Sequence, residues 1–170
     1  MAWVYVGLGS NLGDRVQYLH QALEELKNLR HTIVKNCSHV YETEPVGVKE
    51  QPPFLNMVVE LNSSMIPREL FWELKKIEQL LGRIKTERWG PREIDLDLLY
   101  YGNEVINESD LRLPHPEIAN RRFDLVPMKE IAAEFLDPLH KRTITELLRY
   151  CPDMSTVRKS SQHVPLQAKE

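Results

Sequence analysis

Residues 94–98 alternate between apolar and acidic side chains, and this alternation restricts how the chain can fold. Apolar residues occupy every second position, and Asp95 and Asp97 fall between them. Successive side chains of a β-strand point to opposite faces of its sheet, so the pattern predicts a half-buried strand. Because two residues advance a strand by about 6.5–7 Å, the two carboxylates are expected side by side on one face.

The pair Asp95 and Asp97 is a candidate metal site, because two carboxylates held this close repel each other unless a cation lies against them. Ligands that are all oxygen suit a hard cation, which favours Mg²⁺ over Zn²⁺. An Asp-x-Asp pattern also arises by chance, and a basic run is often a solvated surface. The prediction therefore depends on the acidic pair lying close in sequence to a group of basic residues, with Gly90 and Pro91 breaking regular structure between the two. The basic residues that would suit a polyphosphate are Arg83, Lys85, Arg88 and Arg92.

Length and composition fit one globular domain with a sizeable core. The chain has 170 residues, of which 42% are hydrophobic and 28% are charged. A formal net charge of −3 argues against a protein that coats nucleic acid. The sequence has no apolar run of membrane-spanning length and no signal-peptide pattern, and its two cysteines lack metal spacing. We expect a cytoplasmic monomer without membrane or nucleic-acid partners.

Periodicity and capping residues predict the other elements. Asp14 is a favourable N-cap for a helix that ends near Leu29. Pro67 is well placed as the first residue of a helix that Gly82 terminates. Further expected elements are strands at 3–8, 32–41 and 54–61, a hairpin at 102–103, helices at 126–132 and 144–150, the latter capped by Thr143, and a disordered tail from about Ser155.

The motif Gly7-x-Gly9, which ends the first expected strand, partly matches a dinucleotide-binding loop. Leu12 occupies the place of the third glycine. A helical stretch also occupies the distance at which a second parallel strand with its acidic residue should follow. The dinucleotide-binding interpretation is therefore rejected.

The expected strand 54–61 has two different faces. Alternate apolar residues from Leu55 to Leu61 form a core face, whereas Phe54 and Asn56 lie on the other face. An aromatic ring beside an amide with both donors and an acceptor would suit a flat heterocycle. An exposed polar strand face fits the same pattern, and both interpretations stay open.

Several short blocks of sequence together carry a family resemblance. They are Gly9–Leu12, Tyr41–Gly47, Gln51–Pro52, Phe54–Asn56, Gly82–Arg83, Arg88–Arg92, Ile94–Asp97, Tyr101–Asn103, Pro114–Pro116, and Arg121 with Phe123. In this order they resemble the 6-hydroxymethyl-7,8-dihydropterin pyrophosphokinases of folate biosynthesis. The stretch 88–99 matches the signature of that family and is the most specific of the blocks.

The resemblance implies an α+β ferredoxin-like fold, βαββαβ, in which helices pack on an antiparallel sheet. The predicted element order agrees with that pattern. We expect one pyrophosphokinase domain over residues 1–154 and a disordered tail over 155–170. The implied reaction transfers pyrophosphate from ATP to the hydroxymethyl group of the reduced pterin and releases AMP. Transfer of this kind depends mainly on positioning and electrostatic stabilisation.

The resemblance also implies roles for individual residues. Asp95 and Asp97 would hold two Mg²⁺ ions, while Arg83 and Arg92 would stabilise charge on the pyrophosphate. The residues implied to bind ATP are Glu78, Lys85, Arg88, His115 and Arg121. The residues implied to bind the pterin are Thr43, Val46, Phe54, Asn56, Trp89 and Phe123, with the two phenylalanines stacking on its ring.

Other interpretations stay open on the residues alone. A Mg²⁺-dependent nucleotide-sugar transferase would keep the acidic pair, although such enzymes usually have larger scaffolds. A ferredoxin-like RNA-binding module would use Arg88 and Trp89 as contacts, but the aspartates would repel a phosphate backbone without metal. Glu78 as a lone acid and His115 as a lone histidine also fit solvated positions.

Overall fold

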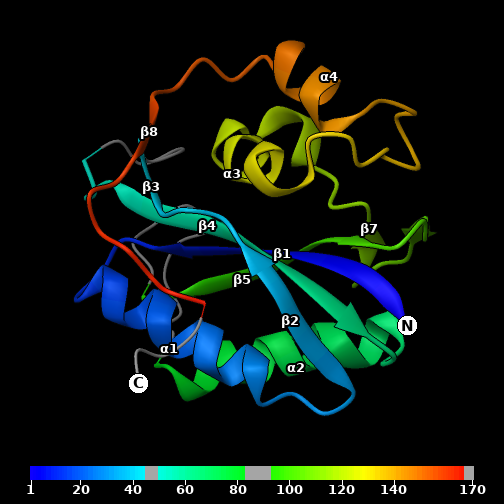
Figure 1. Cartoon of the computed structure of the whole chain (residues 1–170), viewed down its shortest axis with the longest axis horizontal. Coiled ribbons are helices and arrows are strands. Elements are labelled where there is room, and N and C mark those ends of the chain that lie inside the picture. Colours follow the sequence, from blue (N-terminus) through cyan, green and yellow to red (C-terminus); the bar gives the residue numbers. More distant parts are fainter. Residues whose placement is uncertain (45–49, 83–92, 167–170) are drawn as a thin grey trace.

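The computed structural model describes residues 1–44, 50–82 and 93–166 (Figure 1). These residues form eight strands, four α-helices and one short 3-10 helix. In chain order they are β1 (Ala2–Ser10), α1 (Arg15–Lys27), β2 (Thr32–Cys37), β3 (Tyr41–Thr43), β4 (Phe54–Ser63), α2 (Pro67–Leu80), β5 (Asp95–Tyr101), β6 (Ile106–Asn107), β7 (Arg112–Leu113), η1 (Ile118–Asn120), α3 (Arg122–Ala132), α4 (Ile144–Arg149) and β8 (Val157–Lys159).

The main sheet is antiparallel, and β1 lies in it between β5 and β4. Its strand order is β5-β1-β4-β3-β8, and β2 also pairs with β4. β1 pairs along its whole length with β4, from Ala2 opposite Ser63 to Ser10 opposite Leu55. On its other side β1 pairs with β5, the edge strand that carries the two aspartates. The main chain of β1 therefore connects the acidic strand to the rest of the sheet.

Helices cover both faces of this sheet (Figure 1). α1 and α2 pack against one face through apolar residues such as Leu23 and Leu74, together with Leu8 and Leu96 of the sheet. α3 and α4 form a second hydrophobic cluster on the other face, which includes the fully buried Val58 of β4. The second face of β4 was expected to lie away from the core, and this part of the prediction is wrong because α3 covers it.

The predicted helix ends are confirmed where a capping group marks them. Asp14 Oδ1 accepts a hydrogen bond from Gln17 N at 3.2 Å at the start of α1. Pro67 is the first residue of α2, and Gly82 follows that helix with a φ of +88°. Thr143 begins α4 with a capping box, in which its Oγ1 accepts from the N3 backbone at 3.2 Å. These are local signals, which explains why the sequence predicts them well.

Two predictions about strands differ from the structure. The expected strand 32–41 is divided into β2 and β3, both of which pair with β4. The expected hairpin at 102–103 is not formed between β5 and β6 within the described residues, because β6 pairs with β7 in a separate small sheet. The antiparallel neighbour of the acidic strand is β1, which is distant in sequence.

The C-terminal segment was expected to be disordered from Ser155, and this is wrong for the residues described up to 166. β8 (Val157–Lys159) pairs with β3, and Ser160 N donates to Val40 O at 2.8 Å. Val164 is only 3% exposed and joins the first hydrophobic cluster. The segment is ordered because it covers an otherwise open edge of β3, which the local sequence pattern does not reveal.

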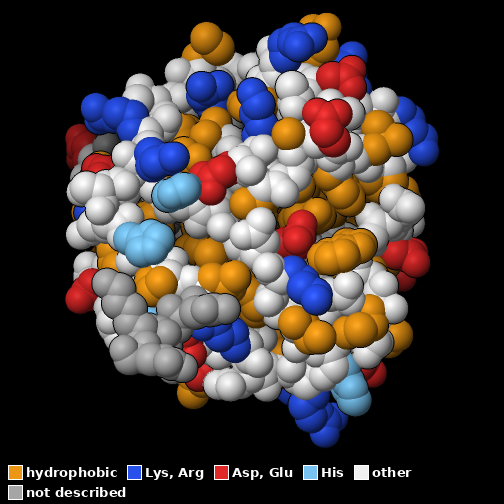
Figure 2. All heavy atoms as spheres, viewed as in Figure 1, with side chains coloured by type: hydrophobic (Ala, Val, Ile, Leu, Met, Phe, Trp, Pro, Cys, Tyr) orange, Lys and Arg blue, Asp and Glu red, His pale blue; other side chains and the backbone are white. Residues whose placement is uncertain are grey.

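The surface viewed in Figure 2 has Lys and Arg side chains interspersed with Asp and Glu. No broad region of one sign of charge is visible on this face, in keeping with the small net charge of −3. Among the described helices, none is long and apolar enough to cross a membrane.

Asp137 provides a test of how the α3–α4 layer is held on the sheet. It is fully buried and accepts hydrogen bonds from Tyr100 OH at 2.6 Å, Leu139 N at 2.7 Å and His140 N at 2.8 Å. Asp137→Ala leaves these donors unpaired, so we expect the free energy of unfolding to fall by about 2–3 kcal/mol. Urea unfolding measures this, with the exposed Glu134→Ala as the matched control.

The same substitution has an expected pH dependence. Burial raises the pKa of Asp137, but the hydrogen bonds from Tyr100 and His140 outweigh it and hold the pKa below the ordinary carboxyl value. The carboxylate therefore stabilises the fold fully above the unfolded pKa of about 3.9, and this contribution is lost as the pH falls through the folded pKa. A difference in stability between wild type and Asp137→Ala that grows on acidification would contradict this assignment.

Candidate active site

The acidic pair lies on the sheet face that is away from α1 and α2. Asp95 and Asp97 are partly exposed, whereas Leu96 and Leu98 between and after them are buried in the first hydrophobic cluster. The predicted alternation of this strand is therefore confirmed. In the register of β5 with β1, Asp95 lies opposite Gly9 and Asp97 lies opposite Gly7.

Gly7 and Gly9 leave the backbone of β1 bare on this face. A Cβ at Gly7 would lie 2.8 Å from Asp124 Oδ1, and a Cβ at Gly9 would lie 2.8 Å from Asn56 Nδ2. Real Cβ atoms do not approach other atoms this closely, so each glycine makes room for a polar side chain. The two glycines that superficially match a dinucleotide loop thus serve the packing of this face.

Asn56 lies beyond Gly9 in the same row of the sheet. Gly9 pairs with Asp95 on one side and with Asn56 on the other, so Asp95 and Asn56 are two strand spacings, roughly 10 Å, apart. Thr43 Oγ1 donates to Asn56 Oδ1 at 2.6 Å and fixes the amide, while its Nδ2 side faces Gly9. Phe54, two residues before Asn56, is half-buried, and its ring edge also approaches the Gly9 position.

Arg121 joins the acidic strand to α3. Its Nη1 donates to Asp97 Oδ2 at 3.1 Å, and its guanidinium lies 5.4 Å from the centre of the Phe123 ring. Burial raises the pKa of Asp97, but the charges of Arg121, His115 and Lys75 outweigh it, so the pKa lies below the ordinary carboxyl value. Asp97 is consequently ionised at neutral pH and remains available as an anionic ligand.

His115 is held in one protonation state by its surroundings. Its Nδ1 accepts a hydrogen bond from Glu117 N at 3.1 Å, and its backbone N donates to Leu99 O at 2.9 Å. Burial, followed by the charge of Arg121, lowers the pKa of His115 to about 4. The ring is therefore neutral near pH 7 and carries its proton on Nε2, which leaves one N–H free to donate to an anionic oxygen.

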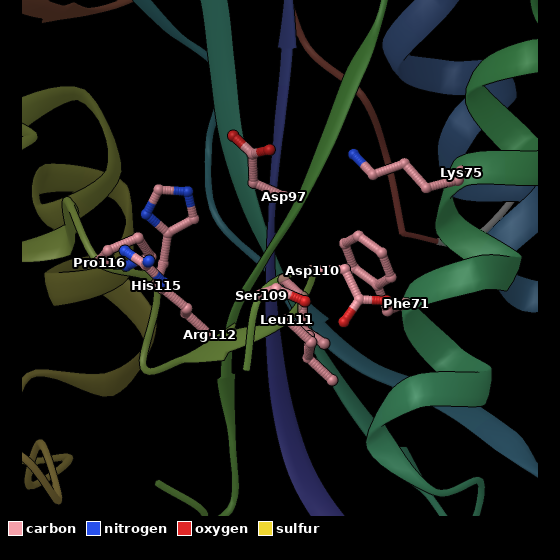
Figure 3. A pocket seen from close by; sticks show the side chains of 10 residues that line it. Phe71, Lys75, Asp97, Ser109, Asp110, Leu111, Arg112, His115 and Pro116 are labelled. Carbon is pink, nitrogen blue, oxygen red and sulfur yellow. The ribbon is translucent and has the colours of Figure 1, made fainter. Parts of the chain in front are cut away.

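A cavity of about 300 Å³ opens beside Asp97. Figure 3 shows Asp97 of β5 between Lys75 of α2 and the His115 ring, with Phe71 and Asp110 further along the cavity. Basic and neutral donors thus surround one carboxylate at the edge of the sheet. Such a lining suits a ligand that is anionic at one end and has an apolar ring at the other.

Glu78 of α2 is almost fully buried, at 1% exposure, rather than solvated. Its Oε1 accepts from Leu96 N at 2.8 Å, and Lys75 Nζ lies 3.3 Å away. Because β5 is an edge strand, the outward N–H of Leu96 faces no neighbouring strand among the described residues. Glu78 satisfies that donor and holds the short segment between the two aspartates in place.

Apart from Glu78, the predicted site residues fall into two groups. Thr43, Phe54, Asn56, Asp95, Asp97, His115, Arg121 and Phe123 lie on or beside the same sheet face. The remaining predicted residues lie outside the described residues: Val46, Arg83, Lys85, Arg88, Trp89 and Arg92.

Sequence reasoning missed Asp124. It is buried next to Gly7 and lies 3.6 Å from Arg121 Nη1. Burial raises the pKa of Asp124 to about 7, and the Arg121 charge only partly offsets this. A usable signal was its helical spacing with the buried Leu125 and Met128, which places an acid on the apolar face of α3.

Comparison with known proteins identifies the family. Residues 5–133 match the family described as 7,8-dihydro-6-hydroxymethylpterin-pyrophosphokinase, or HPPK. The chain is 45% identical over 130 residues to the 2-amino-4-hydroxy-6-hydroxymethyldihydropteridine pyrophosphokinase of Bacillus subtilis, covering 76% of this chain and 78% of that protein. The Haemophilus influenzae protein of the same name is 38% identical over 158 residues, covering 93% and 98%. The chain therefore belongs to the HPPK family.

Solved structures agree with the mixed helical and antiparallel architecture. The Plasmodium falciparum HPPK-DHPS structure has a TM-score of 0.70 and 16% sequence identity. The match covers 87% of this chain and 44% of that longer chain. At this identity the likeness shows the fold alone.

The protonation state of His115 can be measured directly in the metal-free protein. We expect an NMR titration of its ring to give a pKa of about 4. In Arg121→Gln the pKa should rise, because the cation that disfavours the imidazolium is removed. In Asp97→Asn it should fall further, because an anion that favours the charged ring is lost. A wild-type pKa near 6.5 would contradict the described environment.

Proposed function

We propose that this chain transfers pyrophosphate from ATP to the hydroxymethyl group of 6-hydroxymethyl-7,8-dihydropterin and releases AMP, as a step of folate synthesis. Members of the HPPK family catalyse this reaction. The observation that carries the proposal is the row Asp95, Gly9 and Asn56, which places an acidic pair and a fixed amide on one sheet face. A metal–phosphate site and a heterocycle site would then be neighbours.

The acidic pair fits Mg²⁺, in our proposal two ions. Asp97 is ionised, partly exposed and lines the cavity, and Asp95 lies on the same face. Among the described residues no group of three or more His, Cys, Asp or Glu side chains could hold a metal ion alone. Mg²⁺ is commonly held by one or two carboxylates together with substrate phosphates. When bound, it would neutralise charge on the triphosphate oxygens.

We place the nucleotide in the cavity beside Asp97. Lys75 and Arg112 supply positive charge there, and neutral His115 supplies the Nε2–H donor. Arg121 at the same edge would bind a phosphate oxygen through its guanidinium. Glu78 would act on ATP indirectly, by fixing β5. The roles of Lys85 and Arg88 in binding ATP, and of Arg83 and Arg92 in stabilising the pyrophosphate, stay part of the proposal.

We place the pterin over Gly9, with its amide edge towards Asn56 and Thr43. Asn56 Nδ2 is the fixed donor, and its orientation is set by the 2.6 Å hydrogen bond from Thr43. Phe54 and Phe123 would stack on the two sides of the ring. This orientation directs the hydroxymethyl end along the row towards the aspartates. Contacts from Val46 and Trp89 belong to the same proposal.

The arrangement of strands supports a ferredoxin-like assignment. β1, α1, β2, β4, α2 and β5 follow one another as strand, helix, strand, strand, helix and strand. Their order in the sheet is β5-β1-β4-β2, which places the first and third of these strands in the centre. We also propose that the enzyme acts as a monomer.

The reaction is tested by mixing the protein with ATP, Mg²⁺ and the reduced pterin and separating the nucleotides. AMP should accumulate in step with the pyrophosphorylated pterin. ADP as the nucleotide product would mean ordinary kinase chemistry and would refute the proposed reaction.

Asp97→Asn tests the metal assignment without changing side-chain size. We expect kcat/KM to fall by about 10²- to 10³-fold, because a ligand for the cation that stabilises the transferring group is lost. Thermal unfolding should show that the fold is retained, and the exposed Glu104→Gln serves as the control for loss of a carboxylate. Near-normal turnover of Asp97→Asn at saturating Mg²⁺ would contradict the assignment.

Gly9→Ala tests the pterin site. The added methyl would lie 2.8 Å from Asn56 Nδ2 and displace the amide. We expect pterin affinity to fall by about 10- to 100-fold, with little change in ATP affinity. In an Asn56→Ala background, calorimetry should find a smaller loss from Gly9→Ala, because only the contact of the methyl with the ring remains. Equal losses of pterin and ATP affinity would count against the placement.

A further inference from the structure

Arg121 lies between two carboxylates of very different exposure. Its Nη1 is 3.1 Å from Asp97 Oδ2 and 3.6 Å from Asp124 Oδ2. The side chain of Asp97 is 34% exposed and borders the cavity, whereas that of Asp124 is 5% exposed. Arg121 itself is mostly buried, at 15% exposure. The guanidinium therefore has one partner at the site and a second partner behind it.

Asp124, the second partner of Arg121, has a carboxylate oxygen that is unsatisfied among the described residues. Asp124 Oδ2 is buried and has no hydrogen-bond partner among the described residues. Buried carboxylate oxygens are normally satisfied, because leaving one unpaired costs free energy. At 3.6 Å the Arg121 nitrogen is close enough for an ion pair but too far for a hydrogen bond. A small shift of the guanidinium would complete this contact.

Arg121 and a divalent cation would compete for the same carboxylate. A guanidinium hydrogen-bonded to Asp97 Oδ2 occupies one of the lone pairs of this carboxylate and neutralises part of its charge. A cation that binds through Oδ2 therefore competes with Arg121 for this contact. A mostly buried arginine that loses its partner is costly unless another anion replaces it.

Asp124 lies where it can replace Asp97 as the anionic partner of Arg121. Asp124 is three residues after Arg121, on the next turn along the chain, and its Oδ1 lies over Gly7 of β1. Gly7 pairs with Asp97 of β5, so the three positions are neighbours. A methyl at Gly7 would lie 2.8 Å from Asp124 Oδ1, and thus this carboxylate fits only because Gly7 lacks a side chain.

We propose that Asp124 is a positioning residue, which takes over Arg121 when a divalent cation occupies Asp97. The guanidinium then stays beside the cavity, and its release from Asp97 favours metal binding. This inference rests on the proposed metal role of Asp97. A purely structural ion pair on α3 would affect stability but would not change the competition between Arg121 and the metal.

The test uses Mn²⁺ as the probe and measures its binding to the whole chain by the EPR signal of free Mn²⁺. The measurement is made without nucleotide at about pH 8.5, above the pKa of about 7 of Asp124. We expect Asp124→Asn to weaken Mn²⁺ binding by about tenfold, because among the described residues Arg121 then keeps only Asp97 as an ionised partner. In an Arg121→Gln background the same substitution should have little effect, because the competitor is gone.

Two results would overturn the inference. Asp124→Asn with wild-type Mn²⁺ affinity would show that Asp124 does not influence the metal site. An equal loss in the wild-type and Arg121→Gln backgrounds would show a simple charge effect that does not act through Arg121. Asp97→Asn is the separate check on the metal site. If this variant bound Mn²⁺ with wild-type affinity, the proposed metal role of Asp97 would be refuted instead.

Gly7→Ala provides a second variant that alters no charge. Its methyl should displace the Asp124 carboxylate and weaken Mn²⁺ binding in the same direction, again only while Arg121 is present. Thermal unfolding without Mn²⁺ confirms that each variant is folded. Wild-type Mn²⁺ affinity in folded Gly7→Ala would contradict the assigned position of Asp124.

Discussion

The bare backbone of β1 is the constraint on which both halves of the candidate site depend. Gly7 and Gly9 occupy successive positions on one face, and a methyl on either would meet Asp124 or Asn56 at 2.8 Å. Because β1 lies between β5 and β4, this strip separates the acidic pair from Asn56 by two strand spacings. Side chains at these positions would displace Asn56, which we propose to bind the pterin, and Asp124, which we propose to position Arg121.

Residues from the helical layers on both sides of the sheet hold the site residues of this face in place. On one side, Glu78 of α2 accepts from Leu96 N and satisfies the outward edge of β5 between the aspartates. On the other side, α3 begins beside Asp97, so that Arg121 reaches the carboxylate while Phe123 stays next to the guanidinium. The apolar part of α3, with Leu125 and Met128, secures the helix in this position. The site thus combines a rigid sheet with side chains held from both covering layers.

Much of this arrangement could be predicted from the sequence, because its signals are local. Alternation placed Asp95 and Asp97 on one face, and capping residues such as Asp14 and Thr143 marked helix starts. The packing of the two predicted C-terminal helices on the second face of the sheet, the pairing of 157–159 with β3 and the burial of Asp124 could not be predicted, because each depends on contacts between distant segments. The residue roles stay predictions, including those of the basic residues between Arg83 and Arg92, which lie outside the described residues.

The central claim is that the acidic pair binds the metal ion and Asn56 binds the pterin, on opposite sides of Gly9. Paramagnetic broadening of the bound pterin by Mn²⁺, in the presence of a non-hydrolysable ATP analogue, tests it most directly. Since such broadening falls steeply with distance, the hydroxymethyl protons should broaden far more than nuclei at the amide edge of the ring. Equal broadening at both ends, or none, would show that the metal and the pterin are not arranged along this row.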